Sequence, residues 1–223
     1  MLLEMTGSNF NPRKPIKKVM DVQINRESSQ EKILNFDIRR TIILNLYIKE
    51  WSMPEYRVIM TKPEIGVYIE IYYFPSINDK TPARFATVGL SNSIRKTGKP
   101  TETEWMLALE PDLGQESMDR IISYFCDLIA HNIENIKSSE APRVMTESAL
   151  APENWTTKAL LIDELRGESE DLEEIKIGEE IISVLWVVPI THKEARMILQ
   201  EGIDAFDMYI EKSPYSIIAP TRP

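Results

Sequence analysis

The chain has 223 residues, of which 43% are hydrophobic, and a formal net charge of −9 at pH 7. A chain of this length buries about 70% of the surface that its unfolded form exposes, so a stable core needs neither a disulfide nor a structural metal. The single cysteine excludes an internal disulfide, and because no long apolar run occurs we expect neither a secretory signal nor a membrane-spanning helix. These features predict one domain in the reducing cytoplasm.

Charge is distributed unevenly along the chain. Residues 1–99 hold 16 Lys or Arg and 10 Asp or Glu, a net of +6, whereas residues 100–223 hold 10 and 25, a net of −15. The densest acidic run extends from Glu168 to Glu180. An acidic surface repels phosphate backbones and attracts basic proteins, so we expect a protein partner and no nucleic acid. The alternative is that this run is a solvated loop that only maintains solubility.

Residues 1–32 are polar and contain Pro12 and Pro15, which predicts a partly ordered N-terminal arm. Residues 33–223 are expected to form the single domain. Its first element is a helix from Arg39 to Trp51, because apolar residues recur there at helical spacing. The β-branched content of this segment leaves a strand as the alternative.

A half-buried strand is predicted from Val67 to Tyr73, where apolar and less apolar residues alternate. Its less apolar face carries Tyr68, Glu70 and Tyr72. Because tyrosine is favoured as an anchor in protein interfaces, these three residues are candidates for contact with a partner. The alternative is that the tyrosines lie beneath a helix.

Two further strands, Phe85 to Val88 and Trp105 to Leu109, complete a predicted antiparallel meander. Gly89 directly follows the first of them, where we expect a turn conformation that other residues disfavour. Ser91 would need a general base to act as a nucleophile, and neither histidine of the chain stands in a supporting pattern. Gly89 and Ser91 are therefore assigned to the scaffold.

A helix is expected from Ser117 to about Ser138. Cys126 lies close to its apolar positions and is predicted to be a buried, structural thiol. After this helix, Ala159 to Ile162 is predicted to be a short apolar strand.

The last part of the domain combines a strand and a capped helix. Ile181 to Val188 carries no charge and precedes Pro189, which predicts a central strand covered on both faces. Thr191 and Glu194 form the T-x-x-E pattern of a capping box, so a helix should begin at His192. One apolar stripe is expected along this helix, formed by Ala195, Ile198, Leu199, Gly202, Phe206, Tyr209 and Ile210.

These elements predict an α+β fold with a mixed, largely antiparallel sheet and packed helices. Four residues near the end of the chain are expected as scaffold: Trp186 in the strand core, Pro189 as the strand terminator, Ile190 as a hydrophobic staple and Gly202 for close helix packing. The acidic run is expected to be a loop, and it supplies a second set of candidate partner residues: Glu173, Glu174, Glu179 and Glu180.

Two blocks of the sequence resemble the suppressor-of-fused-like family in its bacterial form. The first is Pro189-Ile190-Thr191 followed by Glu194 and Gly202, which is similar to the family's Pro-Ile-Thr/Ser-x-x-Glu turn and Gly-containing helix. The second is residues 84–91, RFATVGLS, which resemble the family's strand and Gly-hydrophobic-Ser turn. The resemblance covers roughly residues 33 to 212, which is the span of one domain.

This resemblance implies a suppressor-of-fused-like domain with a protein partner. Bacterial relatives are often immunity proteins, which bind and neutralise a cognate polymorphic toxin, and the acidic C-terminal half suits a basic toxin domain. The alternative is a general interaction or adaptor module that captures a peptide segment at a sheet edge. The animal relative clamps a peptide between two lobes, and from the resemblance we expect this chain to contain one of them.

No catalytic residue, metal site or cofactor is predicted. His131 and His192 lack the spacing of a metal site, and the glycines do not form a phosphate-binding loop. We therefore predict that the chain is not an enzyme and that it binds neither nucleic acid nor membranes. An enzyme whose site is assembled from distant carboxylates is the remaining class.

Overall fold

The structure of the protein is a computed structural model. It describes residues 19–62, 67–93, 101–111, 113, 118–132, 141–145 and 147–223. By its internal contacts the chain divides into residues 1–35 and residues 36–223. Helix α1 begins in the first part and ends in the second, which contains the sheet and the other helices. The arm predicted for residues 1–32 lies partly outside the described residues and stays a prediction.

The described residues form five α-helices and eight strands. The helices are α1 (Val19–Trp51), α2 (Met118–Asn132), α3 (Glu170–Glu173), α4 (His192–Glu201) and α5 (Ile203–Lys212). The strands are β1 (Tyr56–Lys62), β2 (Val67–Phe74), β3 (Ala83–Val88), β4 (Thr103–Leu109), β5 (Arg143–Met145), β6 (Ala159–Glu164), β7 (Ile175–Ile177) and β8 (Glu180–Ile190). The predicted α+β class is confirmed, as are the predicted strands. The helix predicted from Arg39 to Trp51 is present, but α1 already begins at Val19. Ser117 and residues 133–138 of the helix predicted over 117–138 lie outside the described residues.

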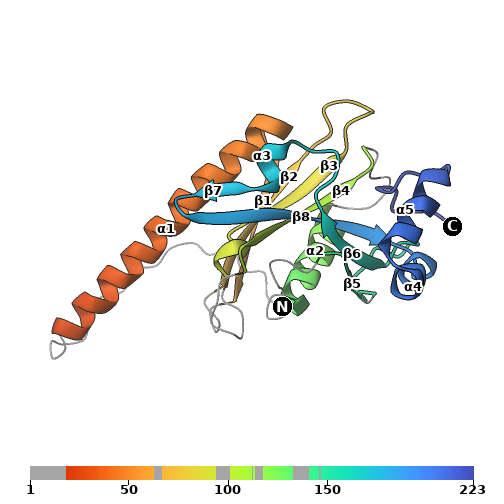
Figure 1. The fold of residues 1–223 in the computed structure, drawn as a ribbon. Coiled ribbons are helices and arrows are strands. Elements are labelled where there is room, and N and C mark those ends of the chain that lie inside the picture. Colours follow the sequence, from red (N-terminus) through yellow and green to blue (C-terminus); the bar gives the residue numbers. More distant parts are fainter. Residues whose placement is uncertain are drawn as a thin grey trace. The chain divides into compact units, whose positions relative to one another are not determined.

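One mixed sheet organises the domain, with the strand order β1-β2-β3-β4-β8-β6-β5. The first four strands form the predicted antiparallel meander, to which β1 is an addition that the sequence did not predict. β8 then pairs in parallel with β4, from Thr103↔Ser183 to Leu107↔Val187, and antiparallel with β6. β7 pairs with the first residues of β8, as Figure 1 shows beside α1. β8 is therefore central, as its uncharged sequence predicted.

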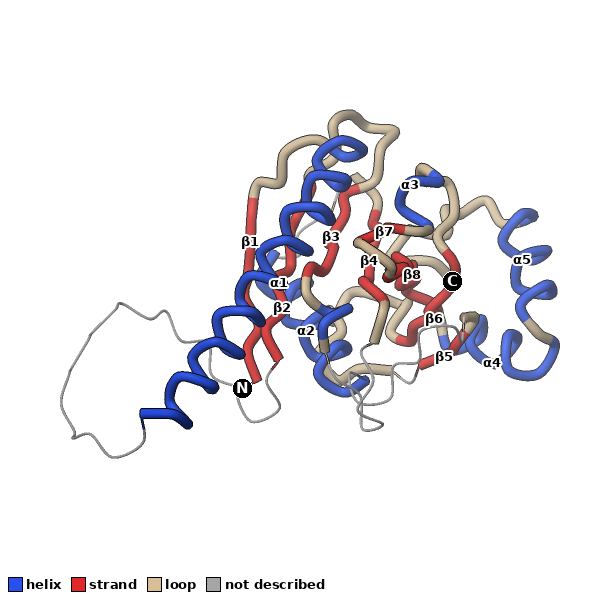
Figure 2. Tube along the Cα trace, turned by 60° about the vertical axis from the view of Figure 1, so that its left-hand side comes forward, coloured by secondary structure: helices blue, strands red, loops and turns tan. Residues whose placement is uncertain are grey.

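Apolar side chains fill both faces of the sheet. On one face α2 packs its Tyr124, Phe125 and Ile129 against residues that include Trp105 and Val187. The other face is covered by α3, α4, α5 and the second half of α1, which runs across β2 and β3 in Figure 2. The sheet thus lies between two helical layers, and the centre of each of its faces is buried.

Pro189 does not end the strand, contrary to its predicted role as a terminator. β8 continues to Ile190, and Pro189 stands opposite Leu160 of β6. The parallel pairing with β4 has already ended at Val187. A proline has no backbone N–H to donate. It is tolerated at this position because β4 no longer pairs with β8 there and requires no donor.

The predicted stripe along a single C-terminal helix is also wrong. The chain forms two helices, which meet at Gly202 with φ 93° and ψ 174°. Leu199 is 72% exposed, whereas Phe206 beyond the break is fully buried. A Cβ at Gly202 would meet no atom within 4 Å, so this glycine serves a backbone conformation rather than the predicted close helix packing.

Candidate interaction surface

The Gly89-Leu90-Ser91 turn is built around the buried carboxylate of Glu104. Its two oxygens accept hydrogen bonds from the backbone N–H groups of Gly89 (3.0 Å), Leu90 (3.2 Å) and Ser91 (3.1 Å). The hydroxyls of Ser91 and Thr87 donate to the same carboxylate at 2.6 Å each. Burial raises the pKa of Glu104, while these donors act in the opposite direction. Ser91 is fully buried in this network, so its hydroxyl is a structural donor.

Gly89 is required in this turn for two reasons. Its φ of +100° lies in the left-handed region that favours glycine. A Cβ there would also stand 2.7 Å from Cε2 of Phe36 and 2.8 Å from the carbonyl oxygen of Tyr68. The turn conformation predicted at Gly89 is confirmed.

The capping box of α4 is confirmed, and it is part of a larger buried network. The hydroxyl of Thr191 accepts from the N–H of Glu194 at 3.2 Å, and the Glu194 carboxylate accepts from the N–H of Thr191 at 2.7 Å. Arg222 donates to both Glu194 oxygens, at 2.8 and 3.0 Å, and to the carbonyl of Pro189 at 2.8 Å. Arg222 and Glu194 are 3% and 1% exposed. Arg222 thereby joins residues near the end of the described chain to the Pro189–Glu194 turn.

Ile190 and Trp186 lie in the core as predicted. Ile190 is fully buried and belongs to the same apolar cluster as Ala195 of α4, which fits a staple across the cap. Trp186 is 6% exposed, and its indole N–H has no hydrogen-bond partner among the described residues.

The structure brings Tyr68, Glu70 and Tyr72 together, but it corrects their expected exposure. Glu70 and Tyr72 are only 2% and 4% exposed, whereas Tyr68 is 40% exposed. Arg40 of α1 donates to the Glu70 carboxylate at 2.7 Å, and Arg57 of β1 does so at 3.1 Å. The Tyr72 hydroxyl donates to Glu70 as well. Burial and the adjacent Glu70 raise the pKa of Tyr72. The alternative prediction is that the tyrosines of this strand face lie beneath a helix. It is correct for Tyr72.

Three polar contacts join the second half of α1 to the acidic segment, and Arg84 of β3 adds a fourth. Arg39 contacts Glu180, and Lys49 reaches Asp171 at 2.7 Å. Glu168 accepts from the indole N–H of Trp51 at 2.7 Å and forms an ion pair with Arg84 at 2.7 Å. Part of the acidic run is thus neutralised by the basic half of the same chain, which the charge count alone did not reveal.

The acidic run is also more ordered than the predicted loop. It contains α3, β7 and the start of β8, and Gly178 with φ +64° lies at the turn between the two strands. Ile175 and Ile182 face the core from this hairpin. The acidic run from Glu168 to Glu180 is therefore a folded element that packs against α1.

Four carboxylates of this element are exposed and have no ion-pair or hydrogen-bond partner among the described residues: Glu170, Glu173, Glu174 and Glu179. We call them the acidic face. Glu170, Glu173 and Glu174 line two hollows. The first, of about 490 Å³, lies between Leu46 of α1 and the segment from Glu170 to Lys176. The second, of about 410 Å³, combines Glu164, Glu173 and Glu174 with Leu165, Val184 and Leu185.

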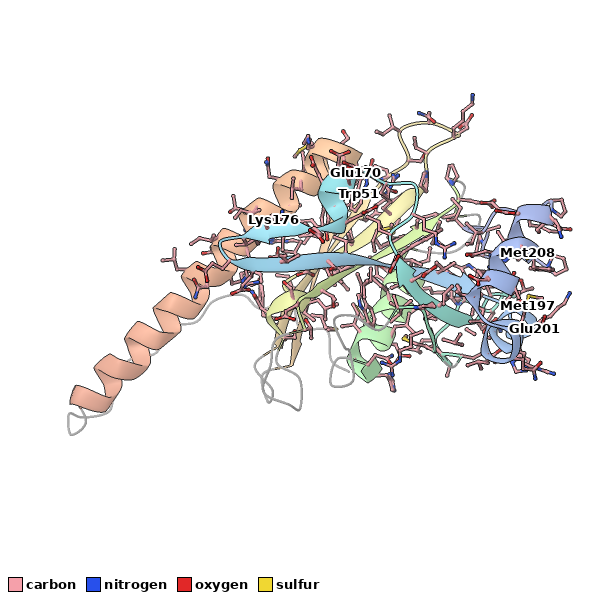
Figure 3. All side chains as sticks on the ribbon, in the orientation of Figure 1. Trp51, Glu170, Lys176, Met197, Glu201 and Met208 are labelled. Carbon is pink, nitrogen blue, oxygen red and sulfur yellow. The ribbon has the colours of Figure 1, made fainter. Side chains whose placement is uncertain are left out.

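Figure 3 places the acidic face within the domain. Glu170 on α3 and Lys176 on β7 lie near Trp51 at the end of α1. Met197 and Glu201 on α4 and Met208 on α5 lie at the other end of the drawn sheet, on the right of the view. Carboxylates near α4 and α5 are therefore suitable controls for those of the acidic face.

Groups with catalytic potential do not converge in the part of the chain that the structure describes. His131 and His192 are exposed and contact Asp127 and Glu147 respectively. No group of three His, Cys, Asp or Glu with metal-binding geometry occurs among the described residues. Cys126 is buried, and burial raises the pKa of its thiol to about 11. No helix among the described residues is long and apolar enough to span a membrane.

Sequence reasoning missed the residues that organise these sites. Arg40, Arg57, Arg84 and Arg222 each pair with a carboxylate at least 13 positions away in the chain. Local patterns carry no signal for such pairs. A weaker signal existed for the hairpin, because Ile175 and Ile177 alternate with Lys176 directly before Gly178.

The mixed sheet between helical layers, with a capped helix after its central strand, defines a class of α+β domain. The chain belongs to the suppressor of fused family: the family model described as Suppressor of fused protein (SUFU) matches residues 66–223. In SUFU this domain mediates protein interactions. A comparison with curated proteins found no match.

Solved structures show the same fold at low identity. A protein described as a suppressor-of-fused homologue from Neisseria gonorrhoeae has a TM-score of 0.63 and 11% identity, over 83% of this chain and 95% of its own. Sufu in a Sufu–Fu complex has a TM-score of 0.56 and 12% identity, over 78% and 84%. Drosophila Suppressor of Fused has a TM-score of 0.56 and 12% identity, over 84% of this chain and 49% of its own. The chain thus spans about half of the Drosophila protein.

Proposed function

We propose that the chain is a non-enzymatic binding protein of the cytoplasm that binds and neutralises a cognate, basic toxin domain. Membership of a family whose domain mediates protein interactions supports binding as the activity. The observation that carries the choice of partner is the acidic face. Its four carboxylates stay unpaired among the described residues while their neighbours Glu168, Asp171 and Glu180 pair within the chain.

Unpaired carboxylates at a surface favour a basic partner in two ways. They accelerate encounter by long-range attraction, and they are free to form ion pairs without first breaking internal ones. The hollow that combines Glu173 and Glu174 with Leu165 and Val184 adds apolar area next to the charges. A lysine or arginine side chain has the matching chemistry, with an apolar stem and a charged end.

The test begins with the reading frames beside the gene. If one encodes a toxin, its co-expression with this chain should restore growth. A variant with Glu170, Glu173, Glu174 and Glu179 all changed to Gln should lose most of this protection, and the association rate should fall and become less sensitive to salt. The matched control carries the same loss of charge at exposed positions elsewhere: Asp79→Asn, Glu153→Gln, Glu201→Gln and Glu211→Gln. Absence of a toxin gene, failure to protect, or equal loss in both variants would contradict the proposal.

Capture of a peptide is the second candidate function, and the open edge at β5 favours it. β5 is the last strand of the sheet, so its outer side has no strand partner among the described residues. A peptide added there would bind through main-chain hydrogen bonds. Binding of this kind would be little affected by the Glu-to-Gln changes in the acidic face, which distinguishes it from the first candidate.

A further inference from the structure

The other end of the sheet is a longer open edge. β1 pairs with β2 without interruption from Tyr56↔Tyr73 to Lys62↔Val67, so it has seven residues in regular register and no bulge. It contains no proline. No hydrogen bond joins its outer backbone groups to another of the described residues. Such an edge is a template for a further strand.

The centre of β1 lacks the usual protection of such an edge, and the second charged residue of the strand, Lys62, stands at its end. Proteins commonly place charges, proline or bulges on an exposed edge strand. Here Ile59, at the centre of β1, is 40% exposed, and Tyr56 is 47% exposed. The one charged residue among residues 56–61 is Arg57, which donates to the buried Glu70 of β2. Its charge is therefore directed inward, along the sheet.

We propose that β1 pairs antiparallel with β1 of a second copy of this chain, to form a symmetric dimer with one continuous sheet. The occupant follows from the self-complementary order of residues 57–61. In the antiparallel register centred on Ile59, Ile59 faces Ile59, Val58 faces Met60, and Arg57 faces Thr61. The two exposed isoleucines cover each other, and no residue of this stretch faces a like charge.

Charge on the rest of the molecule permits this pairing. The acidic hairpin belongs to β7 and β8, and β2, β3 and β4 separate it from β1 in the sheet. Beside β1 the two arginines Arg40 and Arg57 share the single carboxylate of Glu70. The edge therefore escapes the negative field that would repel two acidic copies elsewhere. A twofold axis through Ile59 closes the assembly at two chains.

The first test is the mass in solution. Sedimentation equilibrium over about a hundredfold range of concentration should give a reversible dimer, twice 25.7 kDa, at the upper end. Ile59→Lys places like charges opposite each other and should weaken the dimer about tenfold or more. Ile77→Lys, at a site 65% exposed in the loop before β3, is the matched control and should leave the dimer unchanged. A monomer at every concentration, or a dimer that survives Ile59→Lys, overturns the proposal.

A cysteine pair tests the register and remains informative if Ile59→Lys fails to fold. Directly opposite residues have Cβ atoms about 4.5–5.5 Å apart, so Ile59→Cys should form a disulfide with its copy on mild oxidation. Thr61→Cys is the control, because two copies of position 61 would be about 13 Å apart along the strand. Equal cross-linking of the two variants, or none in either, contradicts the register. The Glu-to-Gln variant of the acidic face should dimerise normally, so failure of the toxin proposal and failure of the dimer are separable.

Discussion

Two groups of carboxylates in this domain differ in what surrounds them. Glu104 and Glu194 are buried, and each accepts hydrogen bonds from several donors that lie in fixed positions. The four residues of the acidic face are exposed and have no partner among the described residues. A buried charge is tolerated only with full pairing, so the first group fixes the fold. An exposed charge costs little when unpaired, so the second group is free to meet a partner.

Removal of Arg222 should break this comparison most severely. Glu194 is 1% exposed, and Arg222→Ala leaves its carboxylate with the N–H of Thr191 as its one remaining donor among the described residues. This change should lower the free energy of unfolding by about 4 kcal/mol. Urea denaturation measures this loss. Arg196→Ala is the control, because Arg196 is exposed on α4, the helix that contains Glu194. It should change stability by less than about 0.5 kcal/mol. Equal effects of the two variants would mean that the buried pair is not a structural determinant.

The second largest effect is expected at Glu104. In Glu104→Gln an amide replaces one oxygen of a carboxylate that accepts five hydrogen bonds, so buried donors lose their acceptor and stability should fall by about 3 kcal/mol. Chemical denaturation at pH 7 measures this change. An unchanged midpoint would show that the turn does not depend on the charge.

The same residue predicts a pH dependence. The pKa of Glu104 is raised in the folded state, so the folded chain holds its proton more tightly than the unfolded chain does. Its contribution to stability is greatest below the unfolded-state pKa, about 4.3, and declines as pH rises from there to the folded-state pKa. The Gln variant lacks this decline. Denaturation of both proteins across this interval should show the stability advantage of the unchanged protein over the variant shrinking as the pH increases.

A smaller loss is expected at the cap of α4. Thr191→Ala removes the acceptor of the Glu194 N–H but keeps the Arg222–Glu194 pair, so the free energy of unfolding should fall by about 1 kcal/mol. Thr191→Ser, which keeps the hydroxyl, should retain most of the stability. A loss as large as that of Arg222→Ala would mean that the cap and the ion pair form one unit.

The smallest effect sharpens the other side of the comparison. The variant with Glu170, Glu173, Glu174 and Glu179 changed to Gln should unfold within about 0.5 kcal/mol of the unchanged protein, because these side chains have no partner to lose among the described residues. Thermal and urea denaturation measure this difference. A large loss of stability would show that the acidic face is structural and would remove it as a partner surface.

The sequence predicted the fold well where the cause is local. The capping box at Thr191 and Glu194, the left-handed turn at Gly89 and the uncharged strand before Pro189 each depend on neighbouring residues, and each is present. Prediction failed where a distant element decides the outcome. The alternation around Tyr72 distinguished the two faces of β2. It did not indicate which of these faces α1 covers. The density of charge from Glu168 onward concealed a folded segment, because the contacts that join this segment to α1 cross more than a hundred positions.

The same dependence on distant contacts limited the candidate site. Glu70 is predicted as a partner contact because it shares the less apolar face of its strand with two tyrosines, which are favoured interface anchors. Two arginines from α1 and β1 instead neutralise it beneath the surface. No pattern within β2 could indicate that arrangement. The partner roles of Tyr68, Glu173, Glu174, Glu179 and Glu180 stay predictions.

The parallel pairing of β4 with β8 has a consequence for biosynthesis. β4, which begins at residue 103, cannot pair with β8 until residue 183 has been synthesised. Until then the nascent meander carries an apolar border from Trp105 to Leu109, which is later fully buried. Closure over such a separation in sequence is slow, since loop entropy is lost before the contacts form. A chain interrupted before residue 180 is therefore left with this border bare and should be a substrate for chaperones or for aggregation.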